Sequence, residues 1–322
     1  MFDLMTVAET ESEKRKEAKL RRDLGIIVRE FEHPDTEDLV LNPDGKLWAK
    51  RAGTPEWIYL GSFPARAALS AFNSIADYRG EVINRDNPIL GTTIPFLGCR
   101  FEGLLPPIVD APSFAIRKGG GRLRPLDEYV ADGVLSTSHR EVIRSALRER
   151  KNILVIGGTG TGKTSLANAI LLDMSVETPN DRVVIIEDNA ELRCSVPNSI
   201  SLLARGKVTM VDCLKSSMRL NPTRMIVGEV RGPESLALLN AWNTGHPGGI
   251  STLHADNARM GLSRLESLLE EATTAPKQKF IAEAVNLVVY IGRDPTVKAG
   301  RRVKEIYAPS GYDGRDYQGT YL

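Results

Sequence analysis

The sequence reads Gly157-Gly158-Thr159-Gly160-Thr161-Gly162-Lys163-Thr164 near its midpoint, and this stretch matches the GxxxxGK[ST] pattern of a phosphate-binding loop. The apolar run 153–156 before it predicts a buried parallel strand. Leu166, Ile170 and Met174 after it have the spacing of a helix. In such a unit, the backbone N–H groups of the loop and the positive end of the helix dipole point at the same anion. The stretch therefore predicts a nucleotide-binding domain built on a parallel α/β sheet.

The polar residues of the loop have distinct expected roles. We expect Lys163 to neutralise the β- and γ-phosphates of ATP and the Thr164 hydroxyl to bind Mg²⁺, with Ser165 completing the phosphate site. The alternative is a glycine-rich turn that only joins a strand to a helix. The complete spacing between a strand and a helix favours the phosphate loop.

The composition is that of a soluble globular protein with room for two domains: 322 residues, 42% hydrophobic and 26% charged. The formal net charge is +1, so there is no bulk attraction to nucleic acid or to an acidic lipid surface. The three cysteines are odd in number and widely spaced, which fits neither a disulfide framework nor a zinc site and indicates a reducing cytosol. No apolar run approaches the roughly 20 residues that span a bilayer, and no signal-peptide pattern is present. We therefore expect a cytoplasmic protein.

The N-terminal segment, residues 6–24, is rich in charges of alternating sign and poor in apolar residues. It predicts a solvated helix. The alternative is a helix that lies on a membrane surface, but Val7, Leu20 and Leu24 form only a thin apolar stripe.

Residues 1–118 predict a small α+β domain. Two apolar runs, 39–41 and 46–48, flank the turn signal Asn42-Pro43-Asp44-Gly45 and predict a hairpin. We further expect a helix over 65–78 and short strands near 98–101 and 114–117.

Three consecutive glycines, Gly119 to Gly121, mark the clearest break in the chain, because such a run neither packs nor holds a fixed backbone. We place a linker at 119–125 and a second domain at 126–322. In that second domain apolar runs alternate with helical patterns, as a parallel α/β sheet requires.

Three further predicted strands of the second domain end directly before polar residues. They are 183–186, followed by Glu187 and Asp188; 225–227, followed by Gly228 and Glu229; and 250–253, followed by His254. In an open parallel sheet the ligand crevice lies at the carboxyl ends of the strands, where the phosphate loop also lies. We therefore expect these side chains at one edge. For any one of them alone, a helix cap or a surface charge is the alternative.

Nucleotide hydrolysis needs a metal and a carboxylate that orients or deprotonates the attacking water. Glu229 and Glu187 are the candidates for this carboxylate. His254 is a candidate to sense the γ-phosphate, and His246 lies in the glycine-rich loop 244–249, which we expect to move with it. The alternative for both histidines is a neutral side chain that ties down a turn.

At these residues the sequence resembles the secretion ATPases of type II and type IV secretion and of type IV pili. Four boxes carry the resemblance: the Walker A loop at 157–164, an Asp box at 182–193, a Walker B box at 224–232 and a His box at 245–256. Their order is specific to the family. Within the family the sequence most resembles the conjugal transfer ATPases of the TrbB kind, in the type IV secretion branch. The short chain and the absence of a four-cysteine zinc insertion favour that branch.

The resemblance implies a RecA-like ATPase domain that uses ATP and Mg²⁺. It implies a cytoplasmic homohexamer, peripheral to the inner membrane, that works with other components of a secretion apparatus. Nucleotide would lie between the two domains, where Arg100 and Arg117 match first-domain arginines that reach the phosphates. A pilus or type II secretion ATPase, a nucleic-acid translocase and a regulatory nucleotide-binding scaffold are the alternatives.

One departure from the usual phosphate-loop enzyme concerns the metal. The strand before Glu229 ends in Gly228, where the ordinary Walker B motif has Asp. The resembling family shares this Gly-Glu form. It leaves open whether Glu187, Asp188 or Glu229 organises the waters of the metal, with Thr164, Glu187 and Glu229 as the expected metal site.

Overall fold

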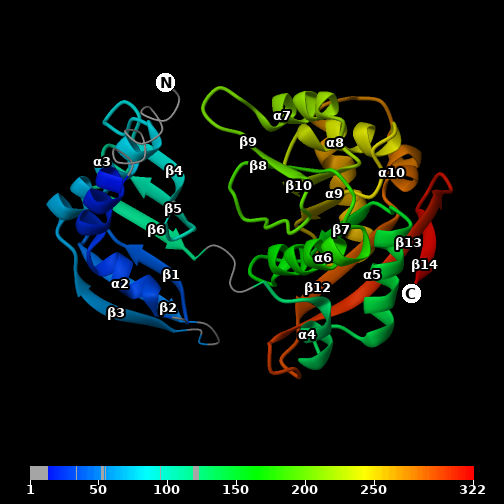
Figure 1. The fold of residues 1–322 in the computed structure, drawn as a ribbon, viewed down its shortest axis with the longest axis horizontal. Coiled ribbons are helices and arrows are strands. Elements are labelled where there is room, and N and C mark those ends of the chain that lie inside the picture. The colour runs from blue at the N-terminus through cyan, green and yellow to red at the C-terminus, as the bar shows by residue number, and fades with distance from the viewer. Residues whose placement is uncertain (1–13, 34, 52–53, 55, 95, 119–122) are drawn as a thin grey trace. The chain divides into compact units, whose positions relative to one another are not determined.

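The computed structural model describes residues 14–33, 35–51, 54, 56–94, 96–118 and 123–322. The chain divides into two compact units, Met1–Gly119 and Gly120–Leu322 (Figure 1). The glycines of the expected linker lie outside the described residues, as do residues 6–13 of the charged N-terminal segment. Within the described residues no helix is long and apolar enough to cross a membrane.

The first unit is α+β. In its described residues the sheet has six strands, all antiparallel, in the order β3-β2-β1-β6-β5-β4. The strands are β1 (Thr36–Leu41), β2 (Lys46–Arg51), β3 (Trp57–Ser62), β4 (Ile89–Ile94), β5 (Cys99–Leu104) and β6 (Ser113–Arg117). A helix over 14–24, α2 (Ile26–Glu32) and α3 (Ala65–Arg79) complete the unit.

The expected hairpin is present as β1 and β2, and its turn is closed by Gly45 at φ 77°. The charged N-terminal helix differs from the prediction. Leu20 and Leu24 are fully buried in the core of the first unit, against strands and α3. The thin apolar stripe is therefore a packing surface, because a narrow stripe is enough to dock a helix whose other faces are charged.

The second unit is an α/β domain around an eight-stranded sheet in the order β14-β13-β12-β7-β11-β10-β8-β9. The strands from β12 to β9 in this order are parallel, whereas β13 and β14 add antiparallel strands at one edge. The strands are β7 (Ile153–Ile156), β8 (Val183–Glu187), β9 (Ser199–Leu203), β10 (Arg224–Glu229), β11 (Ile250–Leu253), β12 (Leu287–Arg293), β13 (Arg301–Tyr312) and β14 (Tyr317–Tyr321).

Helices cover both faces of this sheet (Figure 1). One face packs against α4 (Leu126–Ala131), α5 (Thr137–Arg148) and α6 (Lys163–Glu177). The other face packs against α7 (Met210–Ser217), α8 (Glu234–Asn243), α9 (Ala258–Glu270) and α10 (Gln278–Ala284). A 3₁₀ turn, η1 (Met218–Leu220), follows α7. Both cores are closed by β-branched and leucine side chains, as parallel strands buried on two faces require.

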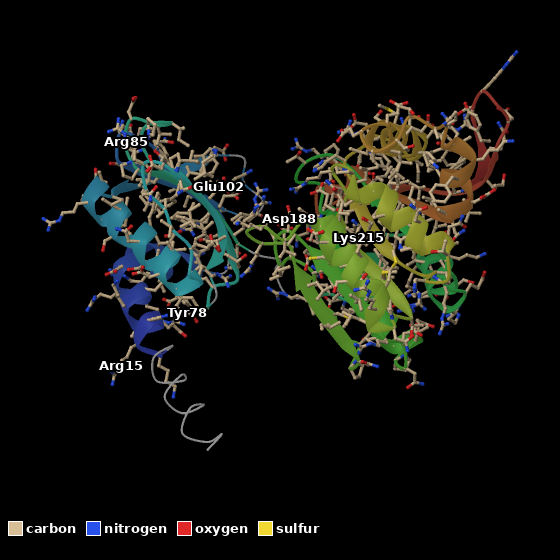
Figure 2. All side chains as sticks on the ribbon, turned by 90° about the horizontal axis from the view of Figure 1, so that it is seen from above. Arg15, Tyr78, Arg85, Glu102, Asp188 and Lys215 are labelled. Carbon is tan, nitrogen blue, oxygen red and sulfur yellow. The ribbon has the colours of Figure 1, made fainter. Side chains whose placement is uncertain are left out.

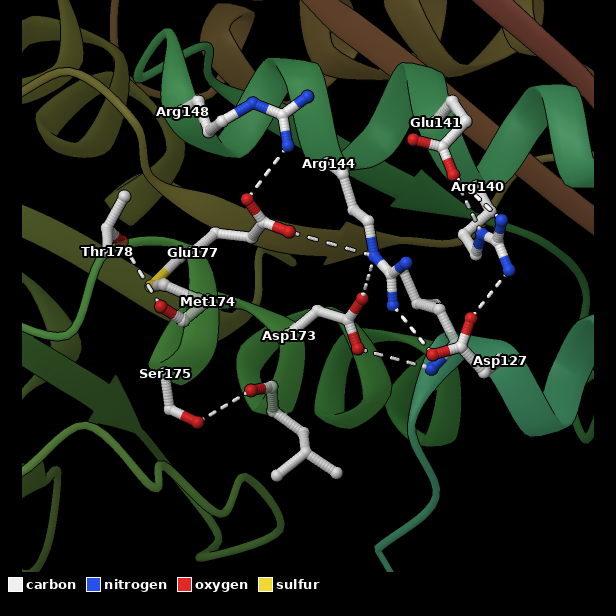
Figure 3. Close-up of polar contacts among 12 residues, drawn as sticks. Asp127, Arg140, Glu141, Arg144, Arg148, Asp173, Met174, Ser175, Glu177 and Thr178 are labelled. Carbon is white, nitrogen blue, oxygen red and sulfur yellow. Dashed lines mark hydrogen bonds and ion pairs between the residues drawn. The ribbon is translucent and has the colours of Figure 1, made fainter.

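An ion-pair network ties α4 and α5 to the helix that follows the phosphate loop (Figure 3). Arg144 of α5 bonds Asp127 of α4 at 2.9 Å and Asp173 of α6 at 2.7 Å. Asp173 is buried, and its second oxygen accepts the backbone N–H of Leu126. Arg148 extends the network to Glu177. The start of the second unit is thereby fixed to α6.

A buried arginine stabilises the sheet at the amino-terminal ends of its parallel strands. Arg224, at the start of β10, is fully buried and bonds Asp181 at 2.5 Å. It also donates to the carbonyl oxygens of Gly248 at 3.0 Å and Leu147 at 2.7 Å. The buried charge is thus paired and hydrogen-bonded, as a buried ion must be.

Candidate active site

Four parallel strands bring the predicted site residues to one edge. β7 leads into the phosphate loop, β8 ends in Glu187, β10 ends in Glu229 and β11 leads into His254. Because β7, β11, β10 and β8 are neighbours with the same direction, their carboxyl ends share one edge of the sheet.

The phosphate loop takes the backbone shape that its glycines allow. Gly160 and Gly162 have φ values of 73° and 94°, a region that side chains disfavour. The Thr161 hydroxyl donates to the carbonyl oxygen of Gly158 at 2.9 Å and holds the turn closed. Helix α6 then starts at Lys163, with Gly162 as its N-cap and no capping side chain. Its first N–H groups are therefore left for a ligand.

Lys163 is buried at the centre of the site, with 7% of its surface exposed. Its ammonium donates to the carbonyl oxygen of Gly158 at 3.2 Å and lies 3.1 Å from Nδ1 of His254. Burial lowers the pKa of Lys163. Among the described residues no carboxylate bonds Lys163 directly. An anionic ligand would therefore stabilise its charged form, since the ligand charge would offset the lost hydration.

A row of polar and charged side chains continues from Lys163 along the strand ends. His254 Nε2 lies 2.9 Å from Glu229 Oε1, although the two atoms are not aligned as a hydrogen bond. Glu229 pairs with Arg231, and Arg231 Nη1 bonds Asp188 Oδ2 at 3.0 Å. Burial and, next, the charge of Lys163 lower the pKa of His254. The imidazole is therefore neutral at pH 7, which lets it accept one hydrogen bond and donate another.

Asp188 is the outer end of this row. Its side chain is about half exposed, and Figure 2 shows it on a loop at the surface of the second unit. Lys163, at the inner end, is buried. The row thus runs from the phosphate loop to solvent.

Glu187 differs from Glu229 in its surroundings. It is 3% exposed, and its Oε1 accepts the backbone N–H groups of Glu191 and Leu192, both at 2.9 Å. Burial raises the pKa of Glu187 to about 7, although the two N–H groups favour the carboxylate. Glu187 therefore changes its protonation near neutral pH, a property common in functional carboxyl groups.

The glycine before Glu229 leaves room for Glu187. A Cβ on Gly228 would lie 3.0 Å from Glu187 Cγ and 3.2 Å from Oε1. An aspartate at position 228 would therefore crowd Glu187 and place a second carboxyl beside it. Packing explains why glycine precedes Glu229 in this strand. The carboxyl of Glu187, from the neighbouring strand, lies beside the position that an Asp side chain would take.

A small pocket beside the loop has several hydroxyl and carboxylate groups in its wall. Thr164, Glu187, Glu229 and Thr252 contribute to its wall. The Thr252 hydroxyl donates to the Gly228 carbonyl oxygen at 2.8 Å. Hydroxyl and carboxylate oxygens suit Mg²⁺, which keeps several waters and takes few ligands from the protein. In the part of the chain that the structure describes, no cluster of three or more His, Cys, Asp or Glu could hold a metal by itself.

The structure does not bring His246 to this site. His246 precedes β11 and so lies at the amino-terminal edge of the sheet, opposite the phosphate loop, with Nδ1 2.9 Å from the Pro222 carbonyl oxygen. Gly248 and Gly249, in the same loop, both donate to the Asn152 side chain. Within one chain the loop 244–249 is thus anchored away from the nucleotide. The glycine-rich pattern indicated a loop but not the edge on which it lies.

Arg100 and Arg117 lie in the first unit, directly opposite each other on β5 and β6. Their side chains therefore share one face of that sheet. Arg117 also bonds Asp38 at 2.6 Å.

Sequence reasoning assigned no role to Arg231 or Thr252. Arg231 stands two residues after Glu229 in the Walker B box, and Thr252 stands two residues before His254. In a strand, residues two apart face the same side, so this spacing is a usable signal for Thr252.

The phosphate loop, the parallel sheet and the strand-end carboxyl groups together define a P-loop ATPase. The family described as Type II/IV secretion system protein matches residues 100–311. The chain is 45% identical over 281 residues to the conjugal transfer protein TrbB of Rhizobium radiobacter, covering 87% of this chain and 86% of that protein. The protein therefore belongs to the Type II/IV secretion system protein family and is an ATP-hydrolysing enzyme.

A second relative supports the family, and a solved structure supports the fold. The chain is 30% identical over 318 residues to the type IV secretion system protein PtlH of Bordetella pertussis, covering 86% of this chain and 91% of that protein. Its fold is similar to that of the ATPase DotB of Legionella pneumophila, with a TM-score of 0.60 and 19% identity over 85% of this chain and 77% of that chain.

Proposed function

We propose that the protein is the ATP-driven motor of a conjugative type IV secretion system and works as a homohexamer. The observation that carries the enzymatic part is the convergence of Lys163, Glu187 and Glu229 at the phosphate loop. The conjugative part is supported by the relatives named for conjugal transfer and type IV secretion. The motor would power pilus assembly, substrate transfer or both, at the cytoplasmic side of the inner membrane.

In this proposal the residues of the second unit divide the chemistry. The loop amides from Gly157 to Ser165 and Lys163 hold the β- and γ-phosphates of ATP. Thr164 and Glu187 hold Mg²⁺ and its waters, and the metal supplies charge neutralisation on the phosphate oxygens. Glu229 orients the attacking water, because its side chain is held between His254 and Arg231. His254 contacts both Lys163 and Glu229, so a γ-phosphate on Lys163 would be sensed there.

The first unit supplies Arg100 and Arg117 in the proposal. Their direct register on β5 and β6 gives two guanidinium groups on one face, which suits the oxygens of a polyphosphate. The linker at 119–125 would absorb the backbone changes as the two units close on nucleotide. Arg100→Lys should then reduce turnover although it keeps the charge, since an ammonium lacks the planar fork of donors.

The test combines turnover with assembly state. The purified full-length chain is assayed for phosphate release and sized with and without Mg-ATP, beside Lys163→Ala. We expect turnover and a six-subunit particle for the wild type, and no turnover for the variant. A wild type that binds ATP without turnover would make the protein a regulatory scaffold. Equal turnover in the two proteins would refute the role of the loop.

A further inference from the structure

The hairpin formed by β12 and β13 packs against both ends of the phosphate loop. A Cβ on Gly157 would overlap the carbonyl oxygen of Ile291 on β12. A Cβ on Gly162 would lie 2.9 Å from Nη1 and 3.1 Å from Cζ of Arg301, the first residue of β13. The guanidinium of Arg301 thus takes the space of a side chain at position 162. The two glycines are required by this hairpin as well as by the turn.

Arg301 is a cation in a position that disfavours cations. Gly162 is the N-cap of α6, and the N-terminal end of a helix carries partial positive charge. Lys163 adds a full positive charge one residue further on. Over the described ranges no carboxylate forms an ion pair with Arg301, whereas the next residue, Arg302, pairs with Asp294. An anion bound at the loop would offset this accumulation of positive charge around the half-buried Arg301.

The sheet order places Arg301 on a different side of the loop from the acidic groups. β7 lies between β12 and β11, so the carboxyl groups of Glu187 and Glu229 come from the β11 side. Arg301 comes from the β12 side. The γ-phosphate and Mg²⁺ belong with the carboxyl groups, since those groups serve hydrolysis. The β12 side therefore faces the remaining part of the nucleotide.

We propose that Arg301 is a second phosphate-binding cation of the ATPase site, and that it binds the phosphate chain on the side away from the γ-phosphate. The inference rests on the proposed nucleotide site at Lys163. Arg301 contributes to binding ATP and ADP alike, and it leaves the chemical step unchanged. It is a binding residue contributed by the same chain as the phosphate loop.

The test measures the Kd values of ATP and ADP and the steady-state kinetics of the full-length chain. Arg301→Met keeps length and packing without the charge, and Arg301→Lys keeps the charge. A hydrogen bond from a charged donor is worth enough to change affinity about tenfold. We expect Arg301→Met to weaken both nucleotides about tenfold and to raise KM with kcat within about twofold. Arg301→Lys should bind both nucleotides with nearly the affinity of the wild type.

Two controls separate the possible failures. Arg302→Gln, on the opposite face of the same strand, should bind nucleotide like the wild type. Wild-type affinity in Arg301→Met, with Lys163→Ala defective, would overturn this inference and leave the proposed function intact. Weaker binding of ATP alone, or a lower kcat alone, would also overturn the inference, because either result would place Arg301 at the γ-phosphate. Nucleotide binding by neither the wild type nor any variant would instead refute the proposed site.

Discussion

Replacing Glu187 by glutamine should stabilise the protein while it lowers activity. Glu187 is 3% exposed, and burial raises its pKa from 4.5 to about 7. Glutamine has the same shape, and its amide oxygen can still accept the N–H groups of Glu191 and Leu192. It cannot ionise, so the variant removes the cost of burying the charge and also removes the carboxyl that we assign to the metal waters.

The magnitude follows from the difference between folded and unfolded pKa values. The unfolded chain loses the proton near pH 4.5 and the folded chain near pH 7, so between these values the folded state binds more protons. The free energy of unfolding of the wild type therefore falls as pH rises through this range, and stays lowered above it. The difference of 2.5 units, from 7 minus 4.5, corresponds to about 3 kcal/mol at 1.36 kcal/mol per unit. Part of this gain is lost because the amide NH₂ also needs a partner.

Thermal unfolding of the full-length chain without nucleotide, at pH 5 and at pH 8, checks the prediction. For a unit of this size we expect Tm to rise by roughly 5–10 °C at pH 8 and by much less at pH 5. Glu234→Gln is the matched control, because Glu234 Oε1 also accepts two backbone N–H groups beside the site. The same increase in Tm in both variants, or an equal increase at both pH values, would refute burial of the Glu187 charge as the cause.

Three other substitutions test separate parts of the second unit. Glu229→Gln should leave ATP binding intact and lower phosphate release by roughly 10²-fold, whereas unchanged turnover would transfer the role of the water-orienting group to Glu187. Gly228→Asp should destabilise by about 1–3 kcal/mol in urea unfolding because it crowds Glu187, and an active, equally stable variant would contradict the packing argument. Arg224→Met should cost about 3 kcal/mol or more because it leaves Asp181 buried without that partner, and a neutral effect in the same assay would show that the ion pair adds little.

Much of the fold could be predicted because its signals are local. The hairpin of β1 and β2 follows from its turn residues, and the start of α6 follows from the glycine loop. The buried strands β7, β8, β10 and β11 follow from short apolar runs. The sequence did not predict β3, whose residues are mostly exposed, or the antiparallel edge formed by β13 and β14. The strands β3 and β14 lie at sheet edges and are mostly exposed, so their apolar pattern is weak.

The candidate site was predictable where a residue directly follows a buried strand. Glu187, Glu229 and His254 share the edge of the loop because parallel neighbours must align their carboxyl ends. His246 shows the limit of the same reasoning, since a loop before a strand lies at the other edge. Arg301 shows another limit: it is distant from the loop in sequence, and only the pairing of β12 with β7 brings it there.

Several groups of the site destabilise the folded protein when nucleotide is absent, so nucleotide binding should change its thermal stability. Lys163 and Glu187 are both buried, and burial shifts the pKa of each toward its neutral form. Arg301 lies beside the positive end of α6 with no carboxylate partner within the described residues. In our proposal each of these costs is offset by Mg-ATP: phosphates meet Lys163 and Arg301, and the cation meets Glu187. Nucleotide should therefore raise Tm by mass action, in proportion to the logarithm of its concentration over Kd. The increase should be reduced in Lys163→Ala and in Arg301→Met.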